Sequence, residues 1–306
     1  MLKYHNLFDG NTLNSSIITI GNYDGIHLGH KYILEEMLFL SMEIKLPTVL
    51  LTFNPHTNDV IFNKPTPLLC SYNKKTEILN MSRLNYLCVV DFTQEISRIN
   101  VDDFMKILIK KYNPKSIVLG YDNKFGYKKT GTFNYLSQNN NYKNIIIKQC
   151  NEFCIKGIPV KSSSIKKFLI NGMIDKANEY LGYKYSISGI VVRGNGIGVK
   201  IGFPTANIEI NENKQLIPSN GVYSVNLTFN NSKYSAICNI GTKPTISMDS
   251  DRSLEVHLID VGNIDLYNQI VDIEFNFKIR DEVRFKNINE LKNQIEKDIK
   301  LLVEGE

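Results

Sequence analysis

The hydrophobic pattern changes once along the chain, near residue 183, and this change constrains the fold more than any other feature. Before it, short apolar runs alternate with segments of helical periodicity. The runs are typical of strands buried on both faces of a sheet, and they lie at residues 17–20, 48–53, 86–91, 116–120 and 145–148. Helical spacing predicts helices over 29–45, 101–112 and 162–181. This alternation predicts an α/β domain with a parallel sheet.

Beyond residue 183, apolar and polar residues alternate, and turn residues rather than helices separate the segments. Strands are predicted at 186–192, 222–229, 233–240, 254–260 and 270–278. Consecutive short strands indicate an antiparallel barrel or sandwich, and the pattern of residues 288–302 predicts an amphipathic helix. We therefore expect two domains, residues 1–182 and 183–306, in line with roughly 150 residues per domain.

Composition narrows the class of protein. Hydrophobic residues make up 42% of the chain, which is enough for sizeable cores and excludes disorder as the dominant state. No stretch approaches the ~18 apolar residues of a membrane helix, and the first ten residues lack the apolar segment of a secretory signal. The five cysteines are odd in number and scattered. We expect a cytoplasmic protein without disulfides or membrane contact.

The positive charge is concentrated in the first domain. Residues 1–182 contain 22 Lys and Arg against 15 Asp and Glu, whereas the rest of the chain contains 14 against 16. This excess favours an anionic ligand, although solvated lysine faces would give the same count. The lysines occur only in pairs, such as Lys74-Lys75, rather than in the dense stripe of a nucleic-acid binder. No nucleic-acid partner is expected.

The segment GNYDGIHLGHK, residues 21–31, lies between a predicted strand and a predicted helix. Its glycines permit tight turns and close approach of the backbone to a ligand. His27 and His30 can both point at an anion attracted by the free N–H groups at the start of the helix. The pattern therefore indicates a polyphosphate site. Two histidines without a ligand remain possible, as does half of a metal site, although no third ligand lies nearby.

The segment resembles the H-x-G-H signature of nucleotidyltransferases, and its longer form G-N-[FY]-D-G-x-H-x-G-H resembles the adenylyltransferase half of bacterial bifunctional riboflavin kinase/FAD synthetases. Two later segments agree with this resemblance: TFNPHT at 52–57 and GYDNKFGYKKTG at 120–131. The second has Asn123 where the family usually has Phe. The resemblance implies a Rossmann-like nucleotidyltransferase domain.

By this resemblance, the phosphate of FMN attacks the α-phosphate of ATP and pyrophosphate leaves. The nucleophile is already an anion, so the enzyme positions two anions and stabilises charge rather than supplying a base. The implied catalytic residues are His27 and His30. The implied nucleotide-binding residues around them are Gly21, Asn22, Asp24, Gly25 and Gly29. Asp122 and Asn54 would bind the flavin, although a loop or helix-cap aspartate is the alternative for Asp122.

The stretch from Lys161 to Gly182 resembles the family segment S-S-T-x-I-R, with Ser162 and Ser163 at the hydroxyl positions. The resemblance assigns them to the nucleotide, whereas the simpler interpretation of Ser162 is a helix cap. Lys166 stands where the family has arginine. Lysine cannot make the bidentate phosphate contact of a guanidinium, so the departure puts the rate of adenylylation in question.

A second glycine-rich string, GNGIGVKIGFPTANI, covers residues 194–208. Gly194, Gly196 and Gly198 invite a dinucleotide-binding interpretation, but no helix follows them. GFPTAN resembles the G-x-P-T-A-N motif of riboflavin kinases, which have a small antiparallel β-barrel fold. The resemblance implies that the loop glycines Gly194, Gly198 and Gly202 contact ATP. Thr205 and Asn207 offer hard oxygen ligands for Mg²⁺.

Phosphorylation of riboflavin needs a proton acceptor beside the 5′-hydroxyl, and a carboxylate suits this role. The family's catalytic glutamate falls on Glu255 in the predicted strand LEVHLID, although an exposed strand glutamate is the plainer interpretation. Arg280 would contact the flavin. We therefore predict a two-domain enzyme that uses ATP, Mg²⁺, riboflavin and FMN. The alternatives are one active domain only, such as the kinase if Lys166 impairs adenylylation, or a flavin-binding module without catalysis.

Overall fold

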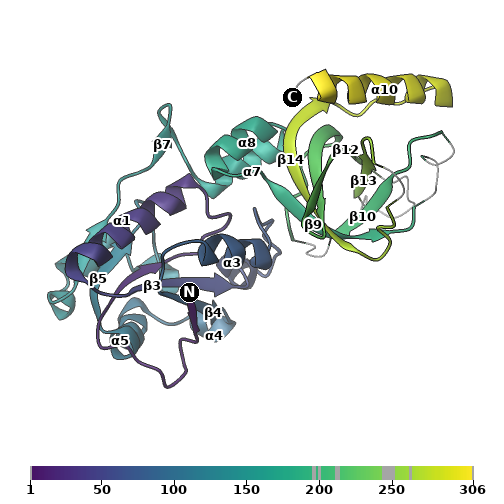
Figure 1. Cartoon of the computed structure of the whole chain (residues 1–306). Coiled ribbons are helices and arrows are strands. Elements are labelled where there is room, and N and C mark those ends of the chain that lie inside the picture. Colours follow the sequence, from purple (N-terminus) through teal and green to yellow (C-terminus); the bar gives the residue numbers. More distant parts are fainter. Residues whose placement is uncertain are drawn as a thin grey trace. The chain divides into compact units, whose positions relative to one another are not determined.

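The structure is a computed structural model that describes residues 2–194, 198, 201–210, 214–242, 252–261 and 264–304. The chain divides into two compact units (Figure 1). The first consists of Met1–Pro67 and Tyr72–Lys161, and the second of Leu68–Ser71 and Ser162–Glu306. Among the described residues, no helix combines the length and the apolar character that a membrane crossing requires.

The first unit is built on a six-stranded sheet in which all strand pairs are parallel. The strand order is β1-β4-β3-β2-β5-β6, with β1 at Lys3–His5, β2 at Ser16–Ile20, β3 at Thr48–Asn54, β4 at Tyr86–Asp91, β5 at Pro114–Leu119 and β6 at Ile146–Gln149. The order reverses at β2, which pairs with β3 on one side and β5 on the other. Ligands of open α/β sheets bind beyond the carboxyl ends of strands at such a reversal.

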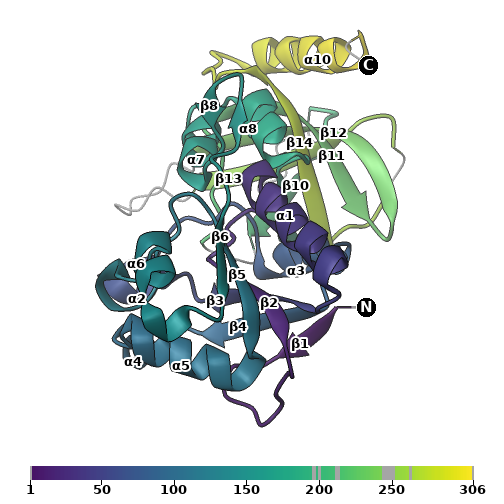
Figure 2. The same ribbon diagram turned by 90° about the vertical axis from the view of Figure 1, so that its left-hand side faces the viewer.

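Helices cover both faces of this sheet (Figure 2). Side chains of α5 pack with Ile18 and Ile20 of β2, whereas those of α1 and α3 pack with Ile17 on the opposite face. The helices are α1 at Leu28–Ile44, α2 at Thr57–Phe62, α3 at Tyr72–Asn80, α4 at Gln94–Ser97, α5 at Val101–Tyr112 and α6 at Phe133–Gln138. Two short 3₁₀ helices at Tyr127–Lys129 and Asn140–Tyr142 and a hairpin of β7 (Cys154–Ile155) and β8 (Ile158–Pro159) complete the unit.

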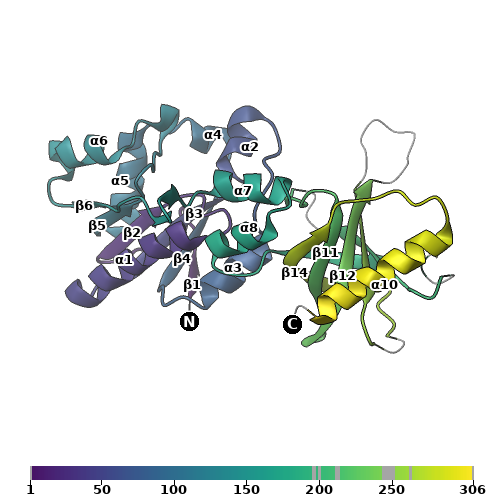
Figure 3. The same ribbon diagram turned by 90° about the horizontal axis from the view of Figure 1, so that it is seen from above.

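The second unit contains a closed barrel in which every neighbouring strand is antiparallel. Its order is β10-β13-β12-β11-β14-β9, with β9 at Ser186–Val192, β10 at Ala206–Ile210, β11 at Gly221–Phe229, β12 at Ser232–Thr242, β13 at Arg252–Leu258 and β14 at Ile270–Arg280. Helix α10, Ile288–Glu304, lies along the outside of the barrel (Figure 3). Ile299 and Leu302 attach it to Val222 and Ile237.

The predicted α/β domain followed by an antiparallel barrel is confirmed. The single helix predicted over 162–181 is wrong, because the structure has two helices, α7 at Ser162–Ile170 and α8 at Ile174–Leu181. The break lies at Gly172, which has a φ of 70°. A Cβ atom there would lie 2.6 Å from Ser219 Oγ, so a side chain has no room. Strands β1 and β10 were not predicted.

Helix α8 is joined to the barrel by both polar and apolar contacts. The Asn178 amide donates to the Phe275 carbonyl at 2.9 Å, and its oxygen accepts from the Tyr185 N–H at 2.7 Å. Ile174 and Leu181 are fully buried. Leu68 adds a parallel bridge to this unit, since its N–H donates to the Lys214 carbonyl at 2.7 Å. The barrel therefore depends on residues that precede the predicted domain boundary.

These contacts predict different stabilities for two fragments of the chain. A fragment of residues 162–306 should unfold at a temperature at least ~10 °C higher than one of residues 183–306. The shorter fragment lacks the Asn178 hydrogen bonds and exposes the surface of β14 that α8 covers in the full chain. Thermal unfolding followed by circular dichroism measures the difference. Equal midpoints would show that α8 does not stabilise the barrel.

Candidate functional site

The first candidate site lies where the sheet order reverses. The loop that begins at Gly21 follows β2, and the loop that begins at Gly120 follows β5. The Asn123 side-chain amide donates a hydrogen bond to the Ile20 carbonyl and so connects the two loops. Position 123, where the sequence departs from the family pattern, therefore helps to hold the two loops of the site together.

His27 and His30 form a stacked pair at the start of α1. Their ring centroids are 3.6 Å apart and the ring planes differ by 16°. His27 caps the helix, because its Nδ1 accepts a hydrogen bond from the His30 N–H at 3.3 Å. An imidazole nitrogen that accepts cannot carry the proton, so neutral His27 has its hydrogen on Nε2. His27 can then donate from Nε2 to an anion without taking up a proton.

Burial keeps both imidazoles neutral in the ligand-free protein. It lowers the pKa of His27 to about 4, and the nearby Asp24 carboxylate only partly opposes this effect. Burial also lowers the pKa of His30 well below its usual value, with smaller contributions from His27 and from the ammonium of Lys75. Among the described residues, no group hydrogen-bonds the buried Nδ1 of His30.

The loop before the histidines has an unusual backbone. Tyr23, Gly25 and Ile26 all have positive φ, at 49°, 84° and 37°. Side chains larger than glycine adopt this region only when surrounding contacts enforce it. In this loop Tyr23 is 3% exposed, and its hydroxyl hydrogen-bonds Thr19 Oγ1 at 2.6 Å. The contacts of the loop thus hold a conformation that its residue types do not favour.

Gly29 allows the two imidazoles to stack. A Cβ atom at this position would lie 2.9 Å from the Val160 carbonyl oxygen and 3.2 Å from His27 Nδ1. The side chain of His27 and the chain around Val160 therefore occupy the space beside Gly29. The predicted close approach of this glycine to a ligand stays a prediction.

Asn22 has contacts that the sequence did not indicate. Its side-chain amide donates to Thr57 Oγ1 at 2.9 Å. Its backbone carbonyl oxygen accepts from Thr52 Oγ1 at 3.0 Å and from Lys75 Nζ at 2.6 Å. In the sequence Lys75 is one of several paired lysines, and no local signal separates it from Lys74.

The remaining residues predicted for adenylylation lie on several elements. Asn54 ends β3 and Asp122 follows β5, and both are exposed at the carboxyl edge of the sheet. Ser162, Ser163 and Lys166 are on α7, in the second compact unit. The roles of these five residues in binding nucleotide or flavin stay predictions.

The second candidate site is on the barrel. Glu255 of β13 is directly opposite Asn207 of β10 on one side and Asn239 of β12 on the other. The alternate residues Leu254 and Val256 are each 1% exposed, so they face the core and Glu255 faces away from it. Residues directly opposite in a sheet have Cβ atoms about 5 Å apart. The strand register thus brings together a predicted metal ligand and the predicted base.

The glycine-rich loop approaches the same face. A Cβ atom at Gly194 would lie 1.9 Å from Asn207 Nδ2, and one at Gly198 would lie 3.1 Å from Thr205 Oγ1. His257 Nδ1 is 2.8 Å from the Pro204 carbonyl oxygen, which anchors the end of the loop at β13. Gly196 lies outside the described residues. Gly194 and Gly198 therefore let the chain approach Asn207 and Thr205 closely, whereas a Cβ atom at Gly202 would meet nothing within 4 Å.

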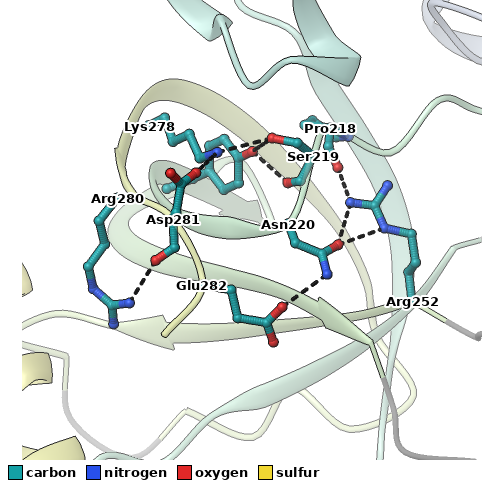
Figure 4. A network of polar contacts seen from close by, with 9 residues as sticks. Pro218, Ser219, Asn220, Arg252, Lys278, Arg280, Asp281 and Glu282 are labelled. Atoms are coloured by element: carbon teal, nitrogen blue, oxygen red, sulfur yellow. Dashed lines mark hydrogen bonds and ion pairs between the residues drawn. The ribbon is translucent and has the colours of Figure 1, made fainter. Parts of the chain in front are cut away.

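Arg280 lies on β14 beside α10. Its Nε and Nη2 donate to the buried Asp298 carboxylate at 3.0 and 2.9 Å. Figure 4 shows Arg280 at the edge of a polar network in which Arg252 donates to Asn220 and Asn220 donates to Glu282. The structure gives Arg280 a packing role at the last helix, and its contact with flavin stays a prediction.

Comparison with known proteins assigns each of the two units to a protein family. Residues 10–164 match the family model for FAD synthetase, and residues 181–304 match the model for riboflavin kinase. A bifunctional riboflavin kinase/FMN adenylyltransferase of Buchnera aphidicola subsp. Schizaphis graminum is 36% identical over 97% of this chain and 96% of that protein. The chain belongs to the bifunctional riboflavin kinase/FMN adenylyltransferase family.

Other members of the bifunctional riboflavin kinase/FMN adenylyltransferase family give the same result. The Escherichia coli K12 protein is 32% identical and the Bacillus subtilis 168 protein 33% identical, each over 92% of this chain and 90% of the relative. A crystal structure described as a macrolide-efflux protein from Streptococcus pneumoniae has a TM-score of 0.88 at 26% identity, covering 98% of this chain and 99% of that one. The α/β unit and the barrel thus occur in the same order in both structures.

The geometry at Gly29 predicts a loss of adenylylation in this family member. Gly29→Ala should reduce FAD formation from supplied FMN by ~10–100-fold, because the new methyl group displaces His27 or the chain at Val160. Gly10→Ala is the matched control, since a Cβ atom there meets nothing within 4 Å. Both variants are assayed by chromatographic separation of FMN and FAD. Full activity of Gly29→Ala would show that the histidine stack tolerates displacement.

Proposed function

We propose that this chain converts riboflavin to FMN at the barrel and FMN to FAD at the α/β unit, with ATP as the second substrate of both steps. The observation that carries the proposal for the α/β unit is the stacked His27–His30 pair at a helix N-terminus, where an imidazole N–H and the free backbone N–H groups suit a polyphosphate. The opposed Asn207 and Glu255 support the kinase step in the same way.

In adenylyl transfer, an oxygen of the FMN phosphate attacks the α-phosphorus of ATP, a new P–O–P bridge forms, and the bond to pyrophosphate breaks. The nucleophile arrives deprotonated, so no residue has to act as a base. Neutral His27 donates from Nε2 to a phosphate oxygen, and His30 adds a second imidazole beside it. Preorganised donors of this kind stabilise the charge that develops in the transition state.

In the kinase step, the 5′-hydroxyl oxygen of riboflavin attacks the γ-phosphorus of ATP and ADP leaves. The hydroxyl proton must be removed as the bond forms, and the Glu255 carboxylate accepts it. The cross-strand contact with Asn207 and Asn239 fixes the position of the Glu255 backbone on a rigid sheet. A base on a barrel strand moves less than one on a loop.

Mg²⁺ fits the donors at the barrel. The described residues contain no cluster of three or more His, Cys, Asp and Glu side chains, so a metal at the barrel would keep waters and substrate phosphates as ligands. Thr205 and Asn207 would hold it with neutral oxygens. When bound, the ion neutralises phosphate charge.

The remaining assignments are part of the same proposal. Ser162, Ser163 and Lys166 contact the ATP phosphates, with Lys166 acting as a point charge in place of an arginine. Asp122 and Asn54 bind FMN, and Gly194, Gly198 and Gly202 lie along the nucleotide at the barrel. The functional boundary lies near residue 182. All five cysteines are free thiols, which supports a cytoplasmic location.

Removal of either imidazole tests the adenylylation site. His27→Ala and His30→Ala should each lower FAD formation from supplied FMN by ~10²–10³-fold, because a donor to the transferring phosphate is lost. Formation of FMN from riboflavin by the same variants serves as the internal control and should persist. Equal loss of both activities would contradict the assignment of the histidines to one step.

The kinase base is tested separately. Glu255→Gln preserves shape but removes the basic oxygen, so riboflavin phosphorylation should fall by ~10²–10⁴-fold. Glu209→Gln is the matched control, because Glu209 is an exposed glutamate on the neighbouring strand β10. Adenylylation of supplied FMN should be unchanged in both variants. Near-normal phosphorylation by Glu255→Gln would exclude Glu255 as the proton acceptor.

A further inference from the structure

Lys75 is a half-buried lysine on α3 that reaches the carboxyl ends of two strands. Its Nζ donates to the Asn22 carbonyl at 2.6 Å and to Thr52 Oγ1 at 2.7 Å. The Thr52 hydroxyl in turn donates to the same carbonyl at 3.0 Å. The ammonium, the hydroxyl and the carbonyl thus form a closed triangle at the start of the histidine loop.

The preceding residue, Lys74, has different hydrogen-bond partners from those of Lys75. Lys74 is half-buried as well, but its Nζ lies 3.1 Å from the carboxylate of exposed Glu77, one turn along the same helix. An ion pair with an exposed partner contributes little to stability. Lys75 instead contacts two residues far away in the sequence, and Thr52 is only 1% exposed. Hydrogen bonds from a charged donor are stronger than those between neutral groups.

Asn22, whose backbone carbonyl accepts the hydrogen bond from Lys75, lies at the start of the loop that leads to His27 and His30. Asn22 precedes Tyr23, the first of the three residues with positive φ, and its side chain is bonded to Thr57 at the start of α2. A backbone that residue preferences disfavour persists only when tertiary contacts determine it fully. Lys75 supplies one of these contacts, and its positive charge also lies among the electrostatic neighbours of His30.

We infer that Lys75 is a positioning residue for adenylyl transfer, which acts by holding the Asn22 carbonyl and thereby the loop that carries His27 and His30. This inference rests on the proposed assignment of the two histidines to the ATP phosphates. Lys75 does not act on the reacting atoms itself. Its loss should therefore lower turnover more than it weakens substrate binding.

The first test compares Lys75→Met with Lys74→Met in the full chain. Lys75→Met should lower kcat for FAD formation from supplied FMN by ~10–100-fold, with KM for FMN and ATP within ~3-fold of the parent. Lys75→Arg, which restores a charged donor, should recover part of the loss. Lys74→Met should stay within ~2-fold. A kcat for Lys75→Met within ~2-fold of the parent overturns the inference.

Thr52 provides a second, independent variant. Thr52→Val removes the hydroxyl that Lys75 and Asn22 share, and should lower kcat by ~3–10-fold; the double variant should depart from the product of the two single effects. If thermal unfolding shows that Lys75→Met does not fold, an unchanged kcat in Thr52→Val overturns the inference. His30→Ala distinguishes failure of the histidine assignment from failure of the Lys75 inference. Full adenylylation activity of His30→Ala refutes the histidine assignment. Loss of activity in His30→Ala together with unchanged activity in Lys75→Met refutes only the role of Lys75.

Discussion

The hydrogen bond from the His30 N–H to His27 Nδ1 is the interaction on which the adenylylation site depends. It caps α1 beside the two stacked rings, and it leaves the hydrogen of neutral His27 on Nε2. The glycine between the histidines leaves the space that this arrangement needs. Because burial lowers the pKa of both imidazoles, the protein does not have to stabilise two positive charges in contact.

The candidate kinase site depends on a different constraint, the register of the barrel strands. Glu255 is opposite Asn207 and Asn239 only because β13 pairs with β10 and β12 in this register. A slip of one residue would turn Glu255 toward the core and expose Leu254 and Val256. Hydrophobic burial on the inner face of the barrel therefore fixes the polar residues on the outer face.

Charged side chains in this protein take their roles from their tertiary partners. Lys74 and Lys75 are adjacent in the sequence, yet one pairs with Glu77 on its own helix and the other reaches the histidine loop. Arg280, which family resemblance connects with flavin, is bonded to the buried Asp298 of α10. Chemical type alone does not separate a positioning residue from a packing residue, because both use the same hydrogen bonds.

The sequence by itself determined the two kinds of unit, most of their strands, the helices α1 and α5, and the strand-end positions of Gly21 and Asp122. These are consequences of hydrophobic periodicity and of local motifs, which neighbouring residues express directly. Only the tertiary structure decided the break between α7 and α8 at Gly172, the inclusion of Leu68–Ser71 in the barrel unit, and the contact between Lys75 and Asn22. Each of these depends on atoms from segments far apart in the sequence, and periodicity shows that a face is buried but not which residues bury it.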